Sequence, residues 1–228
     1  MSDGDRYRAV FWDTGGVLVD LASVREGYAA FVAELAAAHG LDADAALERW
    51  TDTLGEHFRE REGTEYRTAR TGYRKATAAL FDGDPPDGWE RTLERATGAA
   101  LRPEPGAVET VRLLEEAGVR QAIVSDIDTR EAENMLTTFG IRDCFEHVTT
   151  SEAVGHTKPD ERMFRDALSA TGLDSEAVLM IGDRYEHDVA GAAAVGIDPA
   201  GYGAEAWGPE ATHEITDLRE LLDVLGVR

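Results

Sequence analysis

The feature that most constrains the fold is a regular alternation of short apolar runs and helix-like segments after about residue 106. Helix-period segments, most of which end at a glycine, separate candidate strands at 119–124, 145–149, 177–181, 197–202 and 213–215. Strands that alternate with helices in this way pair in parallel and are joined by right-handed crossovers. The pattern therefore predicts an α/β fold with a doubly wound, Rossmann-like parallel sheet.

The first strand of this domain stands apart from the others in the sequence. Residues 7–12 (YRAVFW) form an apolar run that ends at Asp13, but no further strand is visible before about residue 100. The intervening stretch instead carries four alanine-rich segments with helical period, at 22–39, 42–60, 64–80 and 87–97. We therefore predict an α/β core domain at 1–20 and 101–228, into which a helical domain at 21–100 is inserted.

Polar residues follow several of the predicted strands directly. The first strand ends at Asp13, the 119–124 strand at Ser125-Asp126, and the 177–181 strand at Gly182-Asp183. Lys158 precedes a helix in the connection before the 177–181 strand. Because ligands bind at the carboxyl ends of the strands in open parallel sheets, we expect these groups to converge on one rim.

Four motifs that contain these residues resemble those of the haloacid dehalogenase-like superfamily. They occur in the expected order: VFWDTGGVLVD at 10–20, IVSD at 123–126, TKPD at 157–160 and IGDRYEHDVAGAAAVGI at 181–197. Each motif alone is weak, since Lys-Pro pairs and strands that end in Asp or Ser are common. Four of them in order form a specific signal, and they cover the α/β part of the chain.

The resemblance implies a magnesium-dependent phosphatase that acts on a small phosphorylated metabolite. A carboxylate such as Asp13 can attack phosphorus and form an aspartyl-phosphate, which divides one hard step into two. Hard Mg²⁺ suits carboxylate and carbonyl oxygens and offsets the negative charge at the reacting centre. By resemblance, the metal ligands are the Asp13 carboxylate, the Gly15 carbonyl, Asp183 and, directly or through water, Asp188.

The same resemblance assigns roles in binding the phosphoryl group. Ser125 is expected to hydrogen-bond a phosphoryl oxygen, and the Lys158 ammonium to offset the charge of nucleophile and phosphate. The catalytic set is then Asp13, Ser125 and Lys158. Backbone N–H groups near Thr14, Gly16 and Asp126 are further candidates for contact with the substrate.

Simpler interpretations exist for several of these residues. Ser125 or Asp126 fits the N-cap of the helix at 129–139. The single cysteine, Cys144, fits buried packing, and His57, His156 and His187 have no visible partner and fit surface positions. Lys158 also fits a solvated surface, although it is one of only two lysines beside 21 arginines.

One position departs from the usual phosphatase pattern. Phosphatases of this family have a second Asp two residues after the nucleophile, which moves protons during the reaction; here that residue is Gly15. The alternatives are therefore a phosphatase with a substitute acid, a 2-haloacid dehalogenase-type enzyme, a phosphonate hydrolase, or a weakly active regulatory protein that binds phosphate or metal. Dehalogenases of the family are metal-free, and the only lysine of the inserted domain, Lys75, has no supportive context, so we rank the phosphatase first.

The inserted helical domain resembles the α-helical cap of the family. Such a cap closes over the active site, excludes water and selects the substrate. A cap of this size implies a small metabolite as substrate, not a phosphoprotein. The identity of the metabolite does not follow from the residues.

The charge of the chain is strongly acidic, with a formal net charge of −22. Such a surface repels nucleic acid and anionic membranes. The scarcity of lysine predicts adaptation to concentrated salt, with an acidic protein from an Arg-rich genome as the alternative. No apolar run approaches the length of a membrane span, no secretory signal is visible, and a lone cysteine suits a reducing compartment. We therefore expect a cytoplasmic monomer or homodimer.

Overall fold

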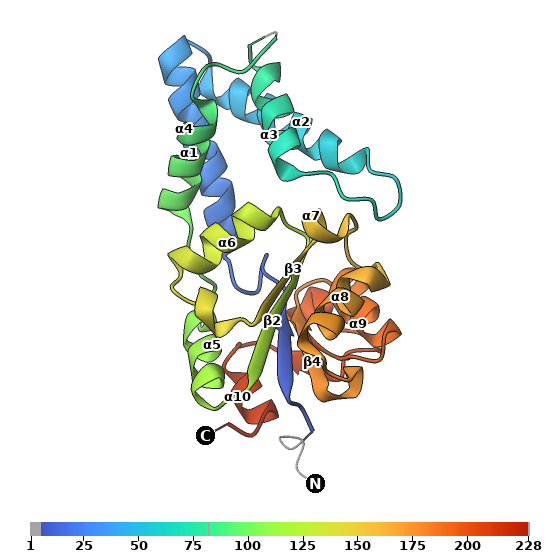
Figure 1. Cartoon of the computed structure of the whole chain (residues 1–228). Coiled ribbons are helices and arrows are strands. Elements are labelled where there is room, and N and C mark those ends of the chain that lie inside the picture. The colour runs from blue at the N-terminus through green and yellow to red at the C-terminus, as the bar shows by residue number, and fades with distance from the viewer. Residues whose placement is uncertain (1–5, 82, 228) are drawn as a thin grey trace. The chain divides into compact units, whose positions relative to one another are not determined.

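The computed structural model describes residues 6–81 and 83–227. The chain forms two compact units: Met1–Asp20 together with Pro103–Arg228, here called the core unit, and Leu21–Arg102, here called the helical unit. Figure 1 shows the elements of both units. Across the described residues, no helix has both the length and the apolar character that a membrane span requires.

The core unit contains a six-stranded sheet in which all neighbouring strands are parallel. The strand order is β3-β2-β1-β4-β5-β6, so the winding direction reverses beside β1. The strands are β1 (Ala9–Trp12), β2 (Arg120–Ser125), β3 (His147–Thr150), β4 (Val178–Gly182), β5 (Asp198–Tyr202) and β6 (His213–Ile215). The predicted doubly wound α/β fold is confirmed.

Strand β1 lies at the centre of the sheet and is completely buried. Its last residue, Trp12, is in register with Ile123 of β2 and Ile181 of β4. The three central strands therefore end at nearly the same level, and the polar residues that follow them are brought to one edge.

Helices cover both faces of the sheet, with α8 and α9 on one side and α5 and α10 on the other (Figure 1). On the α8 side, Phe11 of β1 and Met180 of β4 pack against Phe164 in a shared apolar core. The helices of this unit are α5 (Ala107–Glu116), α6 (Thr129–Thr138), α7 (Ser151–Val154), α8 (Glu161–Thr171), α9 (Ala190–Ala194) and α10 (Glu220–Val224).

The helical unit consists of α1 (Leu21–His39), α2 (Ala43–Arg59), α3 (Ala69–Ala79) and α4 (Trp89–Ala100). Helix α1 packs on α4, and α2 packs on α3. The side chain of Trp50, fully buried on α2, stacks on Tyr73 and donates a hydrogen bond to Thr77 Oγ1 at 3.1 Å. The ring therefore buries apolar surface without leaving its N–H unpaired.

Helix α3 begins five residues later than the sequence period predicts, at Ala69 instead of residue 64. The Thr68 side chain accepts a hydrogen bond from the Thr71 N–H and acts as the N-cap. The periodic pattern continues upstream of this cap, but the backbone there is irregular.

The chain leaves and re-enters the core unit at adjacent points. Val19, just before the helical unit, forms an antiparallel bridge with Pro103, just after it. The Glu104 N–H also donates to the Leu18 carbonyl at 3.0 Å. The two connections are thus held side by side within the core unit.

Candidate active site

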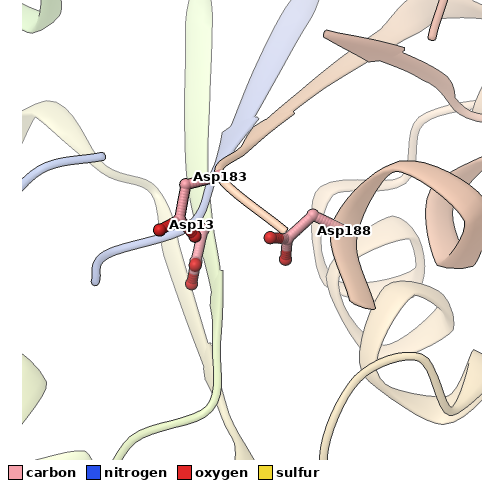
Figure 2. A group of neighbouring side chains, drawn as sticks. All are labelled: Asp13, Asp183 and Asp188. Atoms are coloured by element: carbon pink, nitrogen blue, oxygen red, sulfur yellow. The ribbon is translucent and has the colours of Figure 1, made fainter. Parts of the chain in front are cut away.

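Three carboxylates meet at the carboxyl edge of the sheet. Asp13 follows β1, Asp183 follows β4, and Asp188 lies in a π-helical turn, Tyr185–Val189, that continues into α9. Each offers one oxygen such that the three oxygens lie within 4.8 Å of one another. Figure 2 shows Asp13 beside Asp183, with Asp188 facing them from the helical segment.

Two glycines make room for this carboxylate cluster (Asp13, Asp183 and Asp188). A Cβ atom on Gly16 would lie 2.1 Å from Asp183 Oδ2. The backbone φ of Gly16 is +75°, a conformation that residues with a side chain rarely adopt. A Cβ atom on Gly182 would lie 2.2 Å from the Cβ of Asp188. Gly16 of the first motif and Gly182 of the fourth are therefore required by the close approach of the acids.

The π-helical turn fixes the position of Asp188. The Asp188 side chain accepts a hydrogen bond from the Arg184 N–H at 2.9 Å through Oδ2, while its own N–H donates to the Arg184 carbonyl at 2.9 Å. This reciprocal pair closes the turn that carries the carboxylate. π-Helical turns are rare and often occur at functional sites.

Lys158 is completely buried against the cluster. Its Nζ lies 2.8 Å from Asp13 Oδ1 and 2.5 Å from Asp188 Oδ1. Both contacts are ion pairs between a buried ammonium and a buried carboxylate. Burial alone would lower the pKa of Lys158, but the carboxylates of Asp13 and Asp188 outweigh it and raise that pKa above its ordinary value.

Asp183 is the acid of the cluster that lacks such a partner. Its Oδ1 is buried and accepts no hydrogen bond from the described residues, and Arg184 Nε lies 4.0 Å away. Burial and the neighbouring charges of Asp13 and Asp188 raise the pKa of Asp183 to about 6. Burial, with the charge of Asp13, also raises the pKa of Asp188.

These properties fit a divalent cation. Three carboxylates face one buried ammonium, so negative charge is in excess, and Oδ1 of Asp183 has neither a hydrogen-bond donor nor the ammonium beside it among the described residues. Carboxylate oxygens are the ligands that Mg²⁺ prefers. Asp13, Asp183 and Asp188 are thus the residues that would hold the metal predicted from the sequence.

Of the predicted substrate-binding residues in the first two motifs, Thr14 and Ser125 are buried, and Gly16 and Asp126 are partly buried. Thr14 Oγ1 and Ser125 Oγ are 2.5 Å apart and share a hydrogen bond. The Gly16 N–H donates to the Val19 carbonyl at 2.9 Å, so Gly16 shapes the site through its missing side chain and not through a free N–H group. Gly15, whose carbonyl is a predicted metal ligand, lies between Thr14 and Gly16 in the sequence and forms an isolated β-bridge with Val19.

Asp126 joins three parts of the site, which its position after Ser125 did not reveal. Its Oδ1 accepts hydrogen bonds from the Lys158 N–H at 2.8 Å and from Ser151 Oγ at 3.0 Å. Its Oδ2 accepts one from Arg184 Nη2 at 3.0 Å and lies 3.4 Å from His187 Nδ1. The side chain therefore contacts residues that lie 25 to 61 positions away from it in the sequence.

The environment of Asp126 favours its charged form. Burial alone would raise the pKa of Asp126, yet the hydrogen bond with His187 and the neighbouring cations hold it well below the usual range. Arg184 and His187 were not predicted as functional residues, although both belong to the fourth motif. His187 has an acidic partner here, contrary to the surface position expected for it. The helix at Thr129–Thr138 takes its N-cap from Asp128, so neither Ser125 nor Asp126 serves as a simple cap.

Comparisons with known proteins agree on one family. A family model for haloacid dehalogenase-like hydrolases matches residues 7–196. The chain is 31% identical over 237 residues to the ribulose-1,5-bisphosphate 5-phosphatase of Halopiger xanaduensis, which covers 95% of this chain and 98% of that protein. It is 41% identical over 92 residues to the haloacid dehalogenase-like hydrolase domain-containing protein 3 of Mus musculus, but spans only 36% of that protein.

A solved structure shows the same arrangement of elements. The crystal structure of a HAD phosphatase from Thermococcus onnurineus matches with a TM-score of 0.75 and 26% sequence identity. The match covers 96% of this chain and 98% of that chain.

Proposed function

Because the chain belongs to the haloacid dehalogenase-like hydrolases, we propose that it is a magnesium-dependent phosphatase of small phosphorylated metabolites. The observation that supports this proposal most is the carboxylate cluster with Lys158 buried against it. The relatives that are phosphatases by name, from Halopiger xanaduensis and Thermococcus onnurineus, agree with this reaction class.

Asp13 is the proposed nucleophile. Its Oδ1 contacts the Lys158 ammonium at 2.8 Å, which leaves the second oxygen for attack on phosphorus. Attack forms a bond between this oxygen and phosphorus and breaks the ester P–O bond, and the leaving oxygen takes the electron pair and then a proton. Water then hydrolyses the aspartyl-phosphate, which releases phosphate and restores the carboxylate.

The cluster also governs the charge at the reacting centre. A bound Mg²⁺ would supply Lewis acidity and offset the charge of the phosphoryl oxygens. Lys158 reduces the repulsion between Asp13 and the phosphate, and its buried position makes this interaction stronger than it is in water. Ser125, bonded to Thr14, is proposed to donate to a phosphoryl oxygen.

Gly15 leaves the proposed active site without the usual proton donor for the leaving group. No carboxylic acid follows Asp13 at the second position, so the proton for the leaving group must come from another residue, from water or from the substrate. The same absence suits a 2-haloacid dehalogenase, because halide leaves without a proton. The buried oxygen of Asp183 that has no donor favours the phosphatase, because a halide-releasing site does not need a cation there.

The proposed substrate is a phosphorylated sugar or a comparably small phosphate ester. This proposal is based on the relative from Halopiger xanaduensis, which aligns over almost the whole chain. The role of the helical unit as a substrate-selecting cap remains a prediction from the family resemblance.

The test is release of phosphate from a panel of phosphometabolites in high KCl, with Mg²⁺ or with EDTA. The panel includes ribulose 1,5-bisphosphate, and a parallel assay measures halide release from L-2-chloropropionate. We expect phosphate release that needs Mg²⁺, and its loss in Asp13→Asn to below about a few per cent of the wild-type rate. Metal-independent halide release would replace the proposal with a dehalogenase, and no turnover in either assay would favour a regulatory protein.

A further inference from the structure

The Arg184 guanidinium lies next to the carboxylate cluster, but its hydrogen bond is to Asp126, which is outside the cluster. Nε is 4.0 Å from Asp183 Oδ1, whereas Nη2 donates to Asp126 Oδ2 at 3.0 Å. Its side chain is 43% exposed, so it is far less confined than the fully buried Lys158. The Nε contact lies at the outer limit of an ion pair, so the guanidinium is already adjacent to Asp183.

Arg184 is thus a potential competitor for the ligands of a cation. Its backbone N–H is already bonded to Asp188 Oδ2, which anchors the residue at the edge of the cluster. Burial opposes its charge, but the carboxylates of Asp13 and Asp188 raise the pKa of Arg184 further above its ordinary value. The guanidinium therefore lies within the field of the acids that a divalent cation would need.

Asp126 is well placed to prevent this competition. Its side chain is 13% exposed and fixed at Oδ1 by the Lys158 N–H and the Ser151 hydroxyl, so its Oδ2 is presented at a defined position. That oxygen is the one bonded to Arg184. A buried carboxylate held by donors on one side forms a strong, directional pair with a guanidinium on the other.

We propose that Asp126 is a positioning residue that holds the Arg184 guanidinium away from Asp183 and so keeps the carboxylate cluster available to a divalent cation. The inference rests on the proposed function, since it assumes that the cluster binds Mg²⁺. Asp126 would then affect metal affinity through the position of Arg184, without contacting the metal. Residues that orient metal ligands from outside the coordination sphere typically change metal affinity 10- to 100-fold when mutated.

The experiment measures Mg²⁺ binding to the full-length protein by calorimetry, without substrate. In Asp126→Asn the amide oxygen still accepts from the Lys158 N–H, but the charge that holds Arg184 is lost. We expect the dissociation constant for Mg²⁺ to rise about 10- to 100-fold. In the double variant Asp126→Asn/Arg184→Gln the competitor is also gone, and the constant should return to within about threefold of wild type.

Two further variants complete the test. Arg184→Gln alone should bind Mg²⁺ at least as tightly as wild type, and this holds even if Asp126→Asn folds poorly. Glu146→Gln breaks another pair of an acid with an arginine in the core unit, Arg120–Glu146 at 2.8 Å, and should leave Mg²⁺ affinity unchanged.

The outcomes separate the two proposals. If wild type binds no Mg²⁺, both the proposed function and this inference are wrong. If wild type binds Mg²⁺ but the double variant stays as weak as Asp126→Asn, then Asp126 acts through Lys158 and the inference alone is overturned. Weaker binding in Arg184→Gln also overturns it, because Arg184 would then assist the metal.

Discussion

At the scale of single residues, the site is a balance of buried charges. Lys158 contacts two carboxylates at once, and Asp183 is the acid of the cluster outside these contacts. Its surroundings raise the pKa of Asp183 to about 6, and burial also raises the pKa of Asp188. Asp183 should therefore contribute to the pH dependence of the metal-free protein.

The stability of the metal-free protein should fall as pH rises from about 4 to about 6. The pKa of Asp183 is raised to about 6 in the folded state, so the folded protein binds more protons than the unfolded chain in this window. A shift of about two units corresponds to about 3 kcal/mol of unfolding free energy. Below this window the effect reverses, because the lowered pKa of Asp126 makes its contribution disappear on acidification.

Urea denaturation in EDTA across this range measures the effect. Millimolar Mg²⁺ should abolish the decline by stabilising the ionised carboxylates, and Asp183→Asn should reduce it without any metal. If the stability of the metal-free protein is constant or rises between these pH values, then the pKa of Asp183 is not raised in the folded state.

Gly15 should make the enzyme selective for substrates with good leaving groups. Without an acid at this position, aryl and acyl phosphates should be cleaved much faster than alkyl phosphates. Gly15→Asp should accelerate alkyl phosphates by roughly 10²–10⁴-fold if the new acid is well positioned. The left-handed residue of this turn is Gly16, not Gly15, so the backbone does not oppose the substitution on that ground.

Steady-state rates for p-nitrophenyl phosphate and an alkyl phosphate provide this comparison. Gly98→Asp, at an exposed position of α4 where a Cβ atom meets nothing within 4 Å, serves as the charge control. Equal wild-type rates on both substrates, with no gain in the variant, would mean that a substitute acid already operates.

The residues that the sequence placed on one rim are those for which a general rule exists. Parallel strands end at one edge, so Asp13 and Asp183 meet there whatever the details of the loops. The link between Asp126 and Arg184 follows no such rule. It depends on the π-helical turn after Asp183 and on a partner 58 positions away, and neither is visible in local periodicity.

At the scale of elements, the close packing of α8 and α9 helps to position the segment that carries Lys158. A Cβ atom on Gly191 of α9 would lie 2.9 Å from the Phe164 ring of α8 and 3.0 Å from the Cβ of Pro159. Pro159 directly follows Lys158. The absent side chain therefore lets α9 approach the segment that carries the buried lysine.

Gly191→Ala should destabilise the protein although alanine is the better helix former. Overpacking typically costs about 1–3 kcal/mol, against a gain in helix propensity of about 1 kcal/mol. Gly98→Ala in α4, where a Cβ atom meets nothing within 4 Å, is the matched control and should stabilise slightly. Thermal unfolding of both variants checks this; equal stability changes would show that α9 can shift at no cost.

The sequence predicted most elements but not their neighbours or all of their ends. Strands and helices follow from period and glycine breaks, and parallel pairing follows from their alternation. The order that places β1 between β2 and β4 needs tertiary packing. The start of α3 at Ala69 was missed because one capping threonine outweighs a helical period that continues upstream of it.

At the scale of the whole molecule, the net charge of −22 should make stability depend on salt. Screening of like charges is nearly complete within a few ångströms at molar salt. We expect the thermal midpoint to rise by several degrees between dilute buffer and molar KCl, about equally with NaCl. A midpoint that does not change with salt would assign the composition to genome bias.

The bridge between Val19 and Pro103 has an evolutionary consequence. Since the chain departs and returns at neighbouring backbone positions, the intervening segment can be lengthened, shortened or exchanged without moving any strand of the sheet. The sequence of the helical unit can thus change in evolution while the carboxylate cluster and Lys158 are conserved for a different reason. Exchange of that segment between relatives would therefore require a match only at its two joints, after Asp20 and before Pro103.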